Sequence, residues 1–398
     1  MFDAVVAGHL CIDIIPTIPP SLASTAYASL LSPGRLVEVG VAVLSPGGAV
    51  SNTGLSLARL GMKVRLVARL GDDLIGGLTR RIIEDHGHGL GAGLAIAGGE
   101  PSSYTIVISP PGIDRTFLHC PGTNDTFGPE DVADDLLRGT RLFHLGYPPL
   151  MRRMYAANGA ELAALLERAQ AGGATTSLDL ALPDPATESG SADWRAILGR
   201  ALPHVDLFMP SVEELFFMLD RSGYEEARRR SPDGNLLEGL TEGEVARLAE
   251  GSLTMGAKAV GLKLGDRGLY LRTAESGGLR GRAAPADSER WLGRELWAPC
   301  FRVEVASTVG AGDATIAGFL AGLLSGQRPE ECLTTAVAVG ACNVEAADAT
   351  GGVRSWDETQ RRIADGWERL ATYPISPRWT WNRVAGLWYG PHDRFGGL

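Results

Sequence analysis

The chain has 398 residues, of which 44% are hydrophobic and 21% charged, and this composition excludes a largely disordered protein. Its formal net charge of −10 argues against a nucleic-acid-binding protein, and no apolar run is long enough to span a bilayer. Five scattered cysteines without a C-x-x-C pair are typical of reduced thiols rather than of a disulfide framework. We therefore expect a cytoplasmic globular protein that binds neither nucleic acid nor a membrane.

Strand and helix patterns alternate along most of the chain. Strands are predicted over 2–7, 36–43, 64–68, 104–109, 115–119, 142–145, 175–180, 205–209, 259–264 and 269–272, and helices over 51–60, 74–84, 158–171, 212–219, 312–324 and 329–347. This alternation predicts an α/β fold with a mostly parallel sheet between two helical layers. The strand pieces near 35–45 and the hairpin pattern over 103–119 do not fit that rhythm and indicate a small separate sheet.

The strongest chemical signal is the segment S-T-V-G-A-G-D over 307–313, which precedes a predicted helix. Gly310, Ala311 and Gly312 allow a tight turn whose N–H groups point outward, and the helix adds its positive N-terminal end. This arrangement favours an anion site. Asp313 beside it could be a general base for a hydroxyl nucleophile. The structural alternative is a helix-capping Asp after a glycine-rich turn.

A second glycine pair, Gly47 and Gly48, also precedes a predicted helix that carries Asn52. The glycines let a ligand approach the backbone, and an Asn side chain offers both a donor and an acceptor. Asp13 follows the first strand, where a carboxylate could accept hydrogen bonds from two sugar hydroxyls. A turn with a helix cap and a solvated loop acid are the structural alternatives.

Together these segments resemble the ribokinase-like (PfkB) family of carbohydrate kinases. Residues 47–52 are similar to its N-terminal glycine signature, and 307–313 to its C-terminal signature D-T-x-G-A-G-D. Residues 121–124 resemble the P-G-A-N segment that ends the family's lid hairpin. The resemblance covers about 2–370. It implies a three-layer αβα kinase domain over 1–370, with a β-sheet lid from about 10–50 and 95–125, and a C-terminal extension over 371–398.

The resemblance also implies a reaction: ATP-dependent phosphorylation of a hydroxymethyl group, with Asp313 as base and Gly310, Ala311 and Gly312 forming the anion hole. The residues expected to bind the substrate are Asp13, Gly47, Gly48, Asn52 and Asn124. Those expected at the nucleotide are Lys263, Gly265, Gly268, Thr308 and Asn343. Glu214, at the acidic end of a segment similar to N-x-x-E, is expected to order Mg²⁺.

Three departures from the family pattern bear on these expectations. Ser307 replaces an Asp that often helps to bind a monovalent cation, so a K⁺ requirement stays open. Ser211 replaces the Asn of N-x-x-E. Ala181 and Pro183 break a D-x-N-x-R pattern for acidic sugars, which makes a sugar acid a less attractive substrate.

The partner is expected to be a small sugar or nucleoside, and the family's lid contacts make a homodimer plausible. Two alternatives to a sugar kinase stay open. One is a nucleoside kinase of the same fold, and the other is a catalytically weak regulator that binds a sugar or nucleotide. Tyr147, which follows a predicted strand, is more typical of a turn than of a substrate contact.

Overall fold

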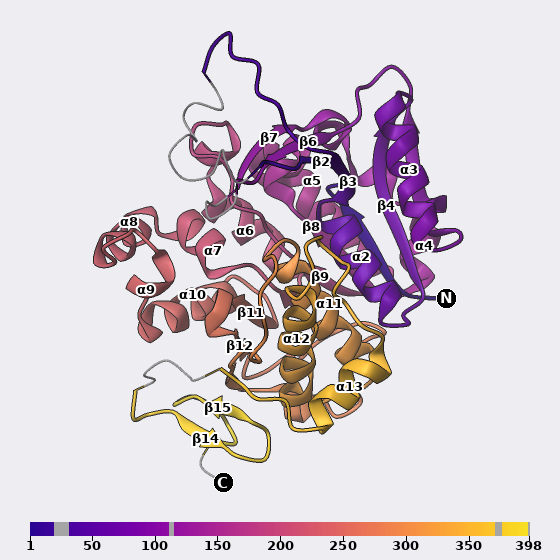
Figure 1. The fold of residues 1–398 in the computed structure, drawn as a ribbon. Coiled ribbons are helices and arrows are strands. Elements are labelled where there is room, and N and C mark those ends of the chain that lie inside the picture. Colours follow the sequence, from indigo (N-terminus) through magenta and orange to yellow (C-terminus); the bar gives the residue numbers. More distant parts are fainter. Residues whose placement is uncertain (20–31, 111–114, 371–375, 397–398) are drawn as a thin grey trace.

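The computed structural model describes residues 1–19, 32–110, 115–370 and 376–396, which form two β-sheets with helices around the larger one (Figure 1). The larger sheet has 11 strands. In spatial order they are β14 (Thr380–Asn382), β15 (Leu387–Tyr389), β13 (Glu295–Ala298), β12 (Leu269–Thr273), β11 (Ala259–Lys263), β10 (Leu207–Phe208), β9 (Thr175–Leu178), β8 (Thr140–Gly146), β1 (Phe2–Gly8), β4 (Val64–Gly71) and β5 (Leu94–Ala97).

The strands from β11 to β5 are parallel, and β12, β13, β15 and β14 continue the sheet in antiparallel pairs. The central strand β1 shows why the sequences of the parallel strands are continuous apolar runs. Ala4 and Val6 face one hydrophobic core, and Val5 and Ala7 face the other. Strands covered on both faces need apolar residues at every position.

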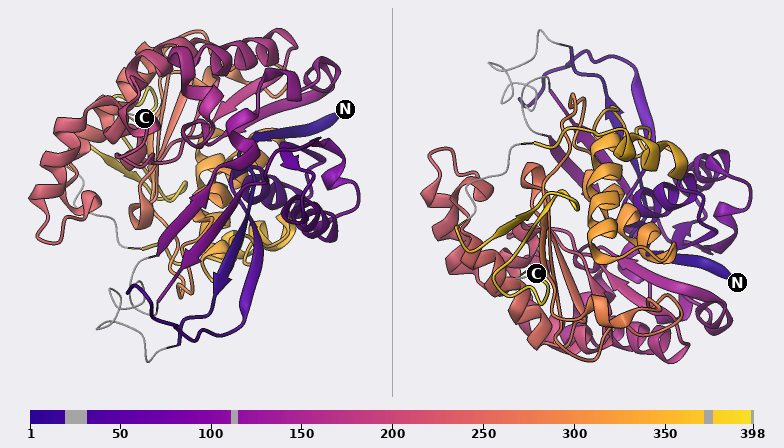
Figure 2. Two further views of the ribbon diagram at one scale, coloured as in Figure 1. Left: turned by 90° about the horizontal axis from the view of Figure 1, so that it is seen from above. Right: turned by 90° about the horizontal axis from the view of Figure 1, so that it is seen from below.

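Helices cover both faces of the large sheet, which confirms the predicted three-layer fold (Figure 2). One face carries α2 (Ala49–Arg59), α3 (Leu74–His86), α11 (Ala311–Leu324), α12 (Pro329–Asn343) and α13 (Trp356–Ala364). The other carries α4 (Asp134–Arg138), α5 (Arg152–Ala171), α6 (Trp194–Ala201), α7 (Val212–Leu219), α8 (Arg221–Arg230), α9 (Leu236–Gly239) and α10 (Glu242–Thr254).

The small sheet projects away from the large one (Figure 2) and has the order β3 (Ala42–Gly47), β2 (Cys11–Pro16), β6 (Tyr104–Ile108) and β7 (Thr116–Cys120). The hairpin of β6 and β7 confirms the prediction, although most of its turn lies outside the described residues. The strand predicted over 36–43 is wrong. Residues 36–41 are mostly exposed and outside both sheets, whereas 42–47 pair with β2.

Other element boundaries differ from the prediction for tertiary reasons. The helix predicted over 158–171 corresponds to the part of α5 that follows non-helical backbone over 156–159, and α5 has in addition a short part from Arg152 before that break. The helix expected to reach 347 ends at Asn343, and the next carbonyl, that of Val344, accepts the N–H groups of Ala306 and Ser307. The segment 222–242, for which no helix was predicted, contains most of α8 and all of α9.

The C-terminal segment over 376–396 extends the large sheet. β15 pairs with β13, and β14 forms the edge strand. Trp379 packs beside Trp297 and Tyr270, with ring centroids 5.8 and 6.1 Å apart. The predicted boundary near residue 370 stays a prediction. Across the described ranges, no helix has the length and apolar character needed to cross a bilayer.

Candidate active site

The candidate site lies where parallel strands of the large sheet end. His9, Tyr147 and Asp179 directly follow β1, β8 and β9, and Lys263 is the last residue of β11. In open α/β sheets, ligands bind outside the carboxyl ends of the strands. The chain therefore places chemistry-bearing side chains from distant segments at the edge where this architecture binds its ligands.

The turn over 307–312, here called the anion turn, leads into α11. Gly310 caps the helix with φ +68°, and a Cβ on it would lie 2.3 Å from the Ala349 carbonyl oxygen, so only glycine fits without a shift. The N–H of Ala311 donates a long bond of 3.3 Å to the Thr308 carbonyl, and Gly312 follows in the first helical turn. The positive end of α11 thus faces the site.

Asp313 is nearly fully buried, and three side chains donate to its carboxylate. Its Oδ2 accepts from Asn52 Nδ2 at 3.0 Å and from the Tyr147 hydroxyl at 2.8 Å, and its Oδ1 accepts from Thr53 Oγ1 at 3.3 Å. These donors come from α2 and from the end of β8. Hydrogen bonds of this kind fix a carboxylate's orientation.

Lys263 lies beside the anion turn in a buried ion pair. Its Nζ donates to Asp179 Oδ1 at 2.7 Å and lies 3.7 Å from where a Cβ on Gly312 would stand. Burial lowers the pKa of Lys263, but Asp179 and then Glu214 raise it, and the net pKa is above the ordinary value. The ammonium is therefore charged and close enough to meet an anion held by the turn.

Glu214 lies in the first turn of α7, where it forms a capping box with Ser211. The Ser211 N–H donates to Glu214 Oε2 at 2.7 Å, and Ser211 Oγ accepts from the Glu214 N–H at 3.1 Å. Ser211, which stands in place of the Asn of the family pattern, thus caps α7. Within the described part of the chain, no group of three or more His, Cys, Asp or Glu side chains has a metal-binding arrangement.

Asp13 and the glycine pair meet in the small sheet. A Cβ on Gly47 would lie 2.4 Å from Asp13 Oδ2, and one on Gly48, whose φ is +91°, would lie 2.5 Å from His9 Nδ1. Glycine therefore lets the turn pack directly on these two side chains. Burial raises the pKa of Asp13, although Cys11, Thr105 and Arg115 each lower it.

The small sheet contacts the large-sheet body at two points of the site. His119 of β7 meets His9, with the two Nε2 atoms 3.3 Å apart. Arg115, just before β7, donates to Thr308 Oγ1 of the anion turn at 3.2 Å. The small sheet therefore lies against both the glycine pair and the anion turn, which is the position that a lid over the site would occupy.

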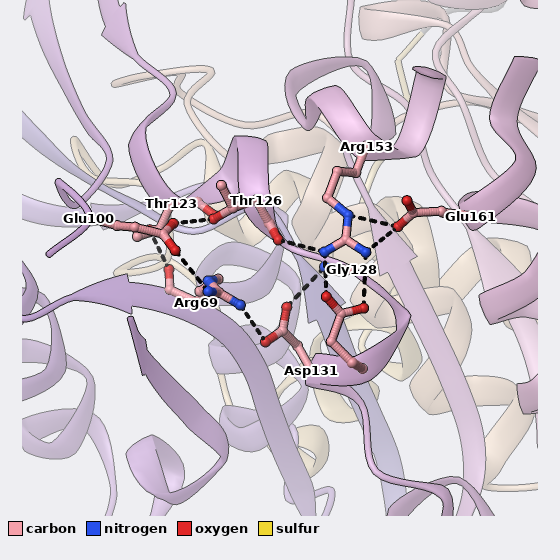
Figure 3. A network of polar contacts seen from close by, with 9 residues as sticks. Arg69, Glu100, Thr123, Thr126, Gly128, Asp131, Arg153 and Glu161 are labelled. Atoms are coloured by element: carbon pink, nitrogen blue, oxygen red, sulfur yellow. Dashed lines mark hydrogen bonds and ion pairs between the residues drawn. The ribbon is translucent and has the colours of Figure 1, made fainter. Parts of the chain in front are cut away.

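Asn124 is fully buried, and both of its amide atoms bond to the backbone of Leu10, at 3.1 and 3.0 Å. A polar network holds the adjoining segment (Figure 3): Thr123 Oγ1 donates to the Arg69 carbonyl, and Arg153 donates to the Thr126 carbonyl. These contacts brace the β1–β2 connection. They do not support the predicted contact of Asn124 with substrate, which stays a prediction.

The residues predicted at the nucleotide occupy two places. Gly265 and Gly268 flank the turn between β11 and β12, where a Cβ on Gly268 would lie 1.9 Å from the Ala298 carbonyl oxygen. Asn343 is fully buried at the end of α12 and donates from Nδ2 to the Val309 carbonyl at 2.9 Å. Its amide thus braces the anion turn, and a contact with adenine stays a prediction without support from this geometry.

Several residues of the site were not predicted from the sequence. Thr53, His9 and His119 belong to no recognisable sequence motif, and the sequence around Tyr147 is typical of a turn. The one available signal for Tyr147 was its position after a strand whose end faces the ligand edge. The pairing of Asp179 with Lys263 joins residues 84 positions apart and has no local signature.

Comparison with known proteins identifies the family of this chain. The pfkB family carbohydrate kinase profile matches residues 1–356. The chain is 26% identical over 279 residues to an uncharacterized sugar kinase of Archaeoglobus fulgidus, covering 70% of this chain and 90% of the relative. It is 26% identical over 335 residues to an ATP-dependent ribose-1-phosphate kinase of Halopiger xanaduensis, covering 84% and 89%.

Among solved structures, Arabidopsis thaliana ribokinase complexed with ribose and ATP has a similar fold. Its TM-score is 0.66 at 19% sequence identity, and the match covers 90% of this chain and 98% of that one. The family profile spans most of the chain and both glycine-rich turns. The chain therefore belongs to the pfkB family of carbohydrate kinases.

Proposed function

We propose that this kinase transfers the γ-phosphoryl group of ATP to a hydroxymethyl group of a sugar, with Asp313 as general base and the anion turn as the site that stabilises the transferred group. The observation that carries the proposal is the carboxylate of Asp313. It is buried in the first turn of α11, oriented by three donors, and adjacent to the turn at the positive end of the helix.

In the proposed reaction, Asp313 accepts the proton of the acceptor hydroxyl as that oxygen attacks the γ-phosphorus. The new O–P bond forms, the bond to the β-phosphate oxygen breaks, and ADP leaves. Charge on the transferred group is stabilised by the N–H groups of Ala311 and Gly312, which requires the long Ala311–Thr308 bond to give way. Lys263 supplies a fixed positive charge on the same side.

Mg²⁺ fits the chemistry of this edge. Asp179 and Glu214 place carboxylates near Lys263, and in the described residues Asp179 Oδ2 is buried without a hydrogen-bond partner. Carboxylate oxygens suit Mg²⁺, which when bound neutralises charge on the β- and γ-phosphates. We propose Glu214 as the residue that orders the Mg²⁺ ion, directly or through a water molecule.

A monovalent cation fits less well. Ser307 offers a neutral hydroxyl in place of a carboxylate, and its Oγ accepts from the Val309 N–H at 3.2 Å. The Val309 carbonyl accepts from Asn343, and the Val344 carbonyl accepts two N–H groups. Because protein donors already bond these oxygens, we propose that the turn is held without K⁺.

The acceptor side supports a neutral sugar. Asp13 can accept two hydroxyl hydrogen bonds, and His9 beside it is kept neutral because burial and then His119 lower its pKa well below the usual value. The Halopiger relative adds ribose 1-phosphate to the substrates worth testing.

The test is ADP release from ATP and Mg²⁺ across pentoses, hexoses, ribose 1-phosphate, sugar acids and nucleosides, with wild type and Asp313→Asn. We expect turnover on one neutral sugar, with kcat about 10²-fold lower or more in the variant. Preference for a nucleoside would replace the substrate assignment. If no compound stimulates ADP release while ATP or a sugar still raises the melting temperature, a binding regulator would be favoured. Full activity of Asp313→Asn would reject Asp313 as the base.

A further inference from the structure

Tyr147 has an unusual backbone and a specific contact. Within the described residues, three residues other than glycine have a positive φ, and the other two lie at the break in α5. Tyr147 has φ +65° and ψ +44°, between the end of β8 and the Pro148–Leu150 turn. A bulky residue is costly in this conformation, and such strain persists where the surroundings over-determine it.

The conformation directs the phenol to the base. The Tyr147 hydroxyl donates to Asp313 Oδ2 at 2.8 Å, across 166 positions of sequence, and the ring lies 5.9 Å from that of His9. Burial, then Asp313 and Asp179, hold the pKa of the phenol well above its ordinary value. The hydroxyl therefore stays protonated and can only donate to the carboxylate.

The distribution of donors over Asp313 is uneven. Oδ2 receives two donors, from Asn52 and Tyr147, and Oδ1 receives one, from Thr53 at the longer distance of 3.3 Å. A carboxylate oxygen has about two lone-pair directions in its plane. Both are filled at Oδ2, whereas Oδ1 keeps one for a further donor.

We infer that Tyr147 is a positioning residue for the phosphoryl transfer: with Asn52 it saturates Oδ2 of Asp313 and so assigns proton acceptance to Oδ1. This inference rests on the proposed function, in which Asp313 is the base. Tyr147 acts through Asp313 and need not touch the sugar. Its loss should therefore slow the chemical step and leave binding unchanged.

The experiment compares Tyr147→Phe with wild type on the sugar identified above. The substitution keeps the ring and removes only the hydroxyl. We expect kcat to fall about ten- to a hundred-fold, while the KM values for sugar and ATP and the melting temperature stay near wild type. Calorimetric binding of the sugar and of a non-hydrolysable ATP analogue gives a second readout, and both dissociation constants should be unchanged.

The matched control is Tyr155→Phe. Tyr155 lies in α5, on the face of the large sheet opposite to α11, and its ring centroid is 6.4 Å from that of Trp194. This variant should leave kcat unchanged. If Tyr147→Phe fails to fold, Tyr147→Gln, which keeps a donor, decides the question. It should fold and show a kcat two- to tenfold below wild type.

Two results would overturn the inference: an unchanged kcat in the folded variant, or a raised KM for the sugar with kcat intact, which would make Tyr147 a substrate contact. Asp313→Asn is run in parallel. If that variant is fully active, the proposed function fails. If it is inactive while Tyr147→Phe is fully active, only the role of Tyr147 fails.

Discussion

The two glycine-rich turns look alike in sequence, yet they contribute different things to the site. Each precedes a helix without a side-chain cap, and each contains a glycine of positive φ, Gly48 or Gly310. The first delivers donors, since Asn52 and Thr53 of α2 bond to Asp313. The second delivers the acid itself and the N-terminal end of a helix. The comparison teaches that a local glycine signal identifies a turn, whereas the next residues and their partners decide its chemistry.

Replacing Gly310 by Ala should have the largest effect. The added Cβ would approach the Ala349 carbonyl oxygen to 2.3 Å, and the backbone is left-handed. We expect kcat to fall by about 10²-fold or more, because the anion turn must move, with about 1–3 kcal/mol of lost stability. Steady-state kinetics and urea unfolding measure both. Gly326→Ala is the control, since it has φ +79° with open space around it. Equal kinetic losses in the two variants would contradict the role of the turn.

Asn52→Ala tests what the first turn delivers. It removes one of the two donors to Asp313 Oδ2, so we expect kcat to fall about tenfold because the carboxylate is less well oriented. Ser56→Ala is the control in the same helix, where Ser56 Oγ donates to the Asn52 carbonyl at 2.6 Å and not to Asp313. If Asn52→Ala instead raises only the KM for the sugar, Asn52 contacts the substrate, and the first turn then contributes a substrate contact rather than a donor that orients Asp313.

Lowering the pH should destabilise the protein through His9, which lies beside the first glycine-rich turn. The folded-state pKa of His9, which packs on Gly48, is well below 6.5, so the unfolded state binds the proton first as pH falls. The free energy of unfolding should therefore drop below pH 6.5, by about 1.4 kcal/mol per pH unit from this group. Chemical unfolding at pH 7.5 and 5.5 measures the slope. His9→Asn should reduce this slope and leave the part that comes from His144 and His119, whose pKa values burial also lowers, whereas His392→Gln, on the exposed surface, should leave it unchanged. An unchanged slope in His9→Asn would show that His9 does not cause it.

The smallest effect concerns K⁺ at the second turn. Because Asn343 and backbone N–H groups already bond the Val309 and Val344 carbonyls, replacing KCl by tetramethylammonium chloride at constant ionic strength should change kcat/KM by less than about twofold. Titrating KCl into the assay checks this. Saturable activation of tenfold or more would mean that a cation displaces the Asn343 contact.

Sequence patterns alone determined the layered fold, the paired β6–β7 hairpin and the two turns. These follow from local physics. Apolar runs and helical periodicity report which faces are buried, and glycines mark backbone conformations that other residues avoid. The place of Asp313 in the first turn of a helix was predictable for the same reason, since it follows the glycine-rich turn directly along the chain.

Only the tertiary structure decided what the polar side chains bond to. Asn52 meets Asp313 across 261 positions, and Asn124 and Asn343 turn their amides to backbone instead of outward. Tyr147 reaches Asp313 through a left-handed backbone conformation that no periodicity in the sequence predicts. A hydrogen bond depends on which elements pack together and at what distance, and that information is spread over the whole chain rather than held in any one segment.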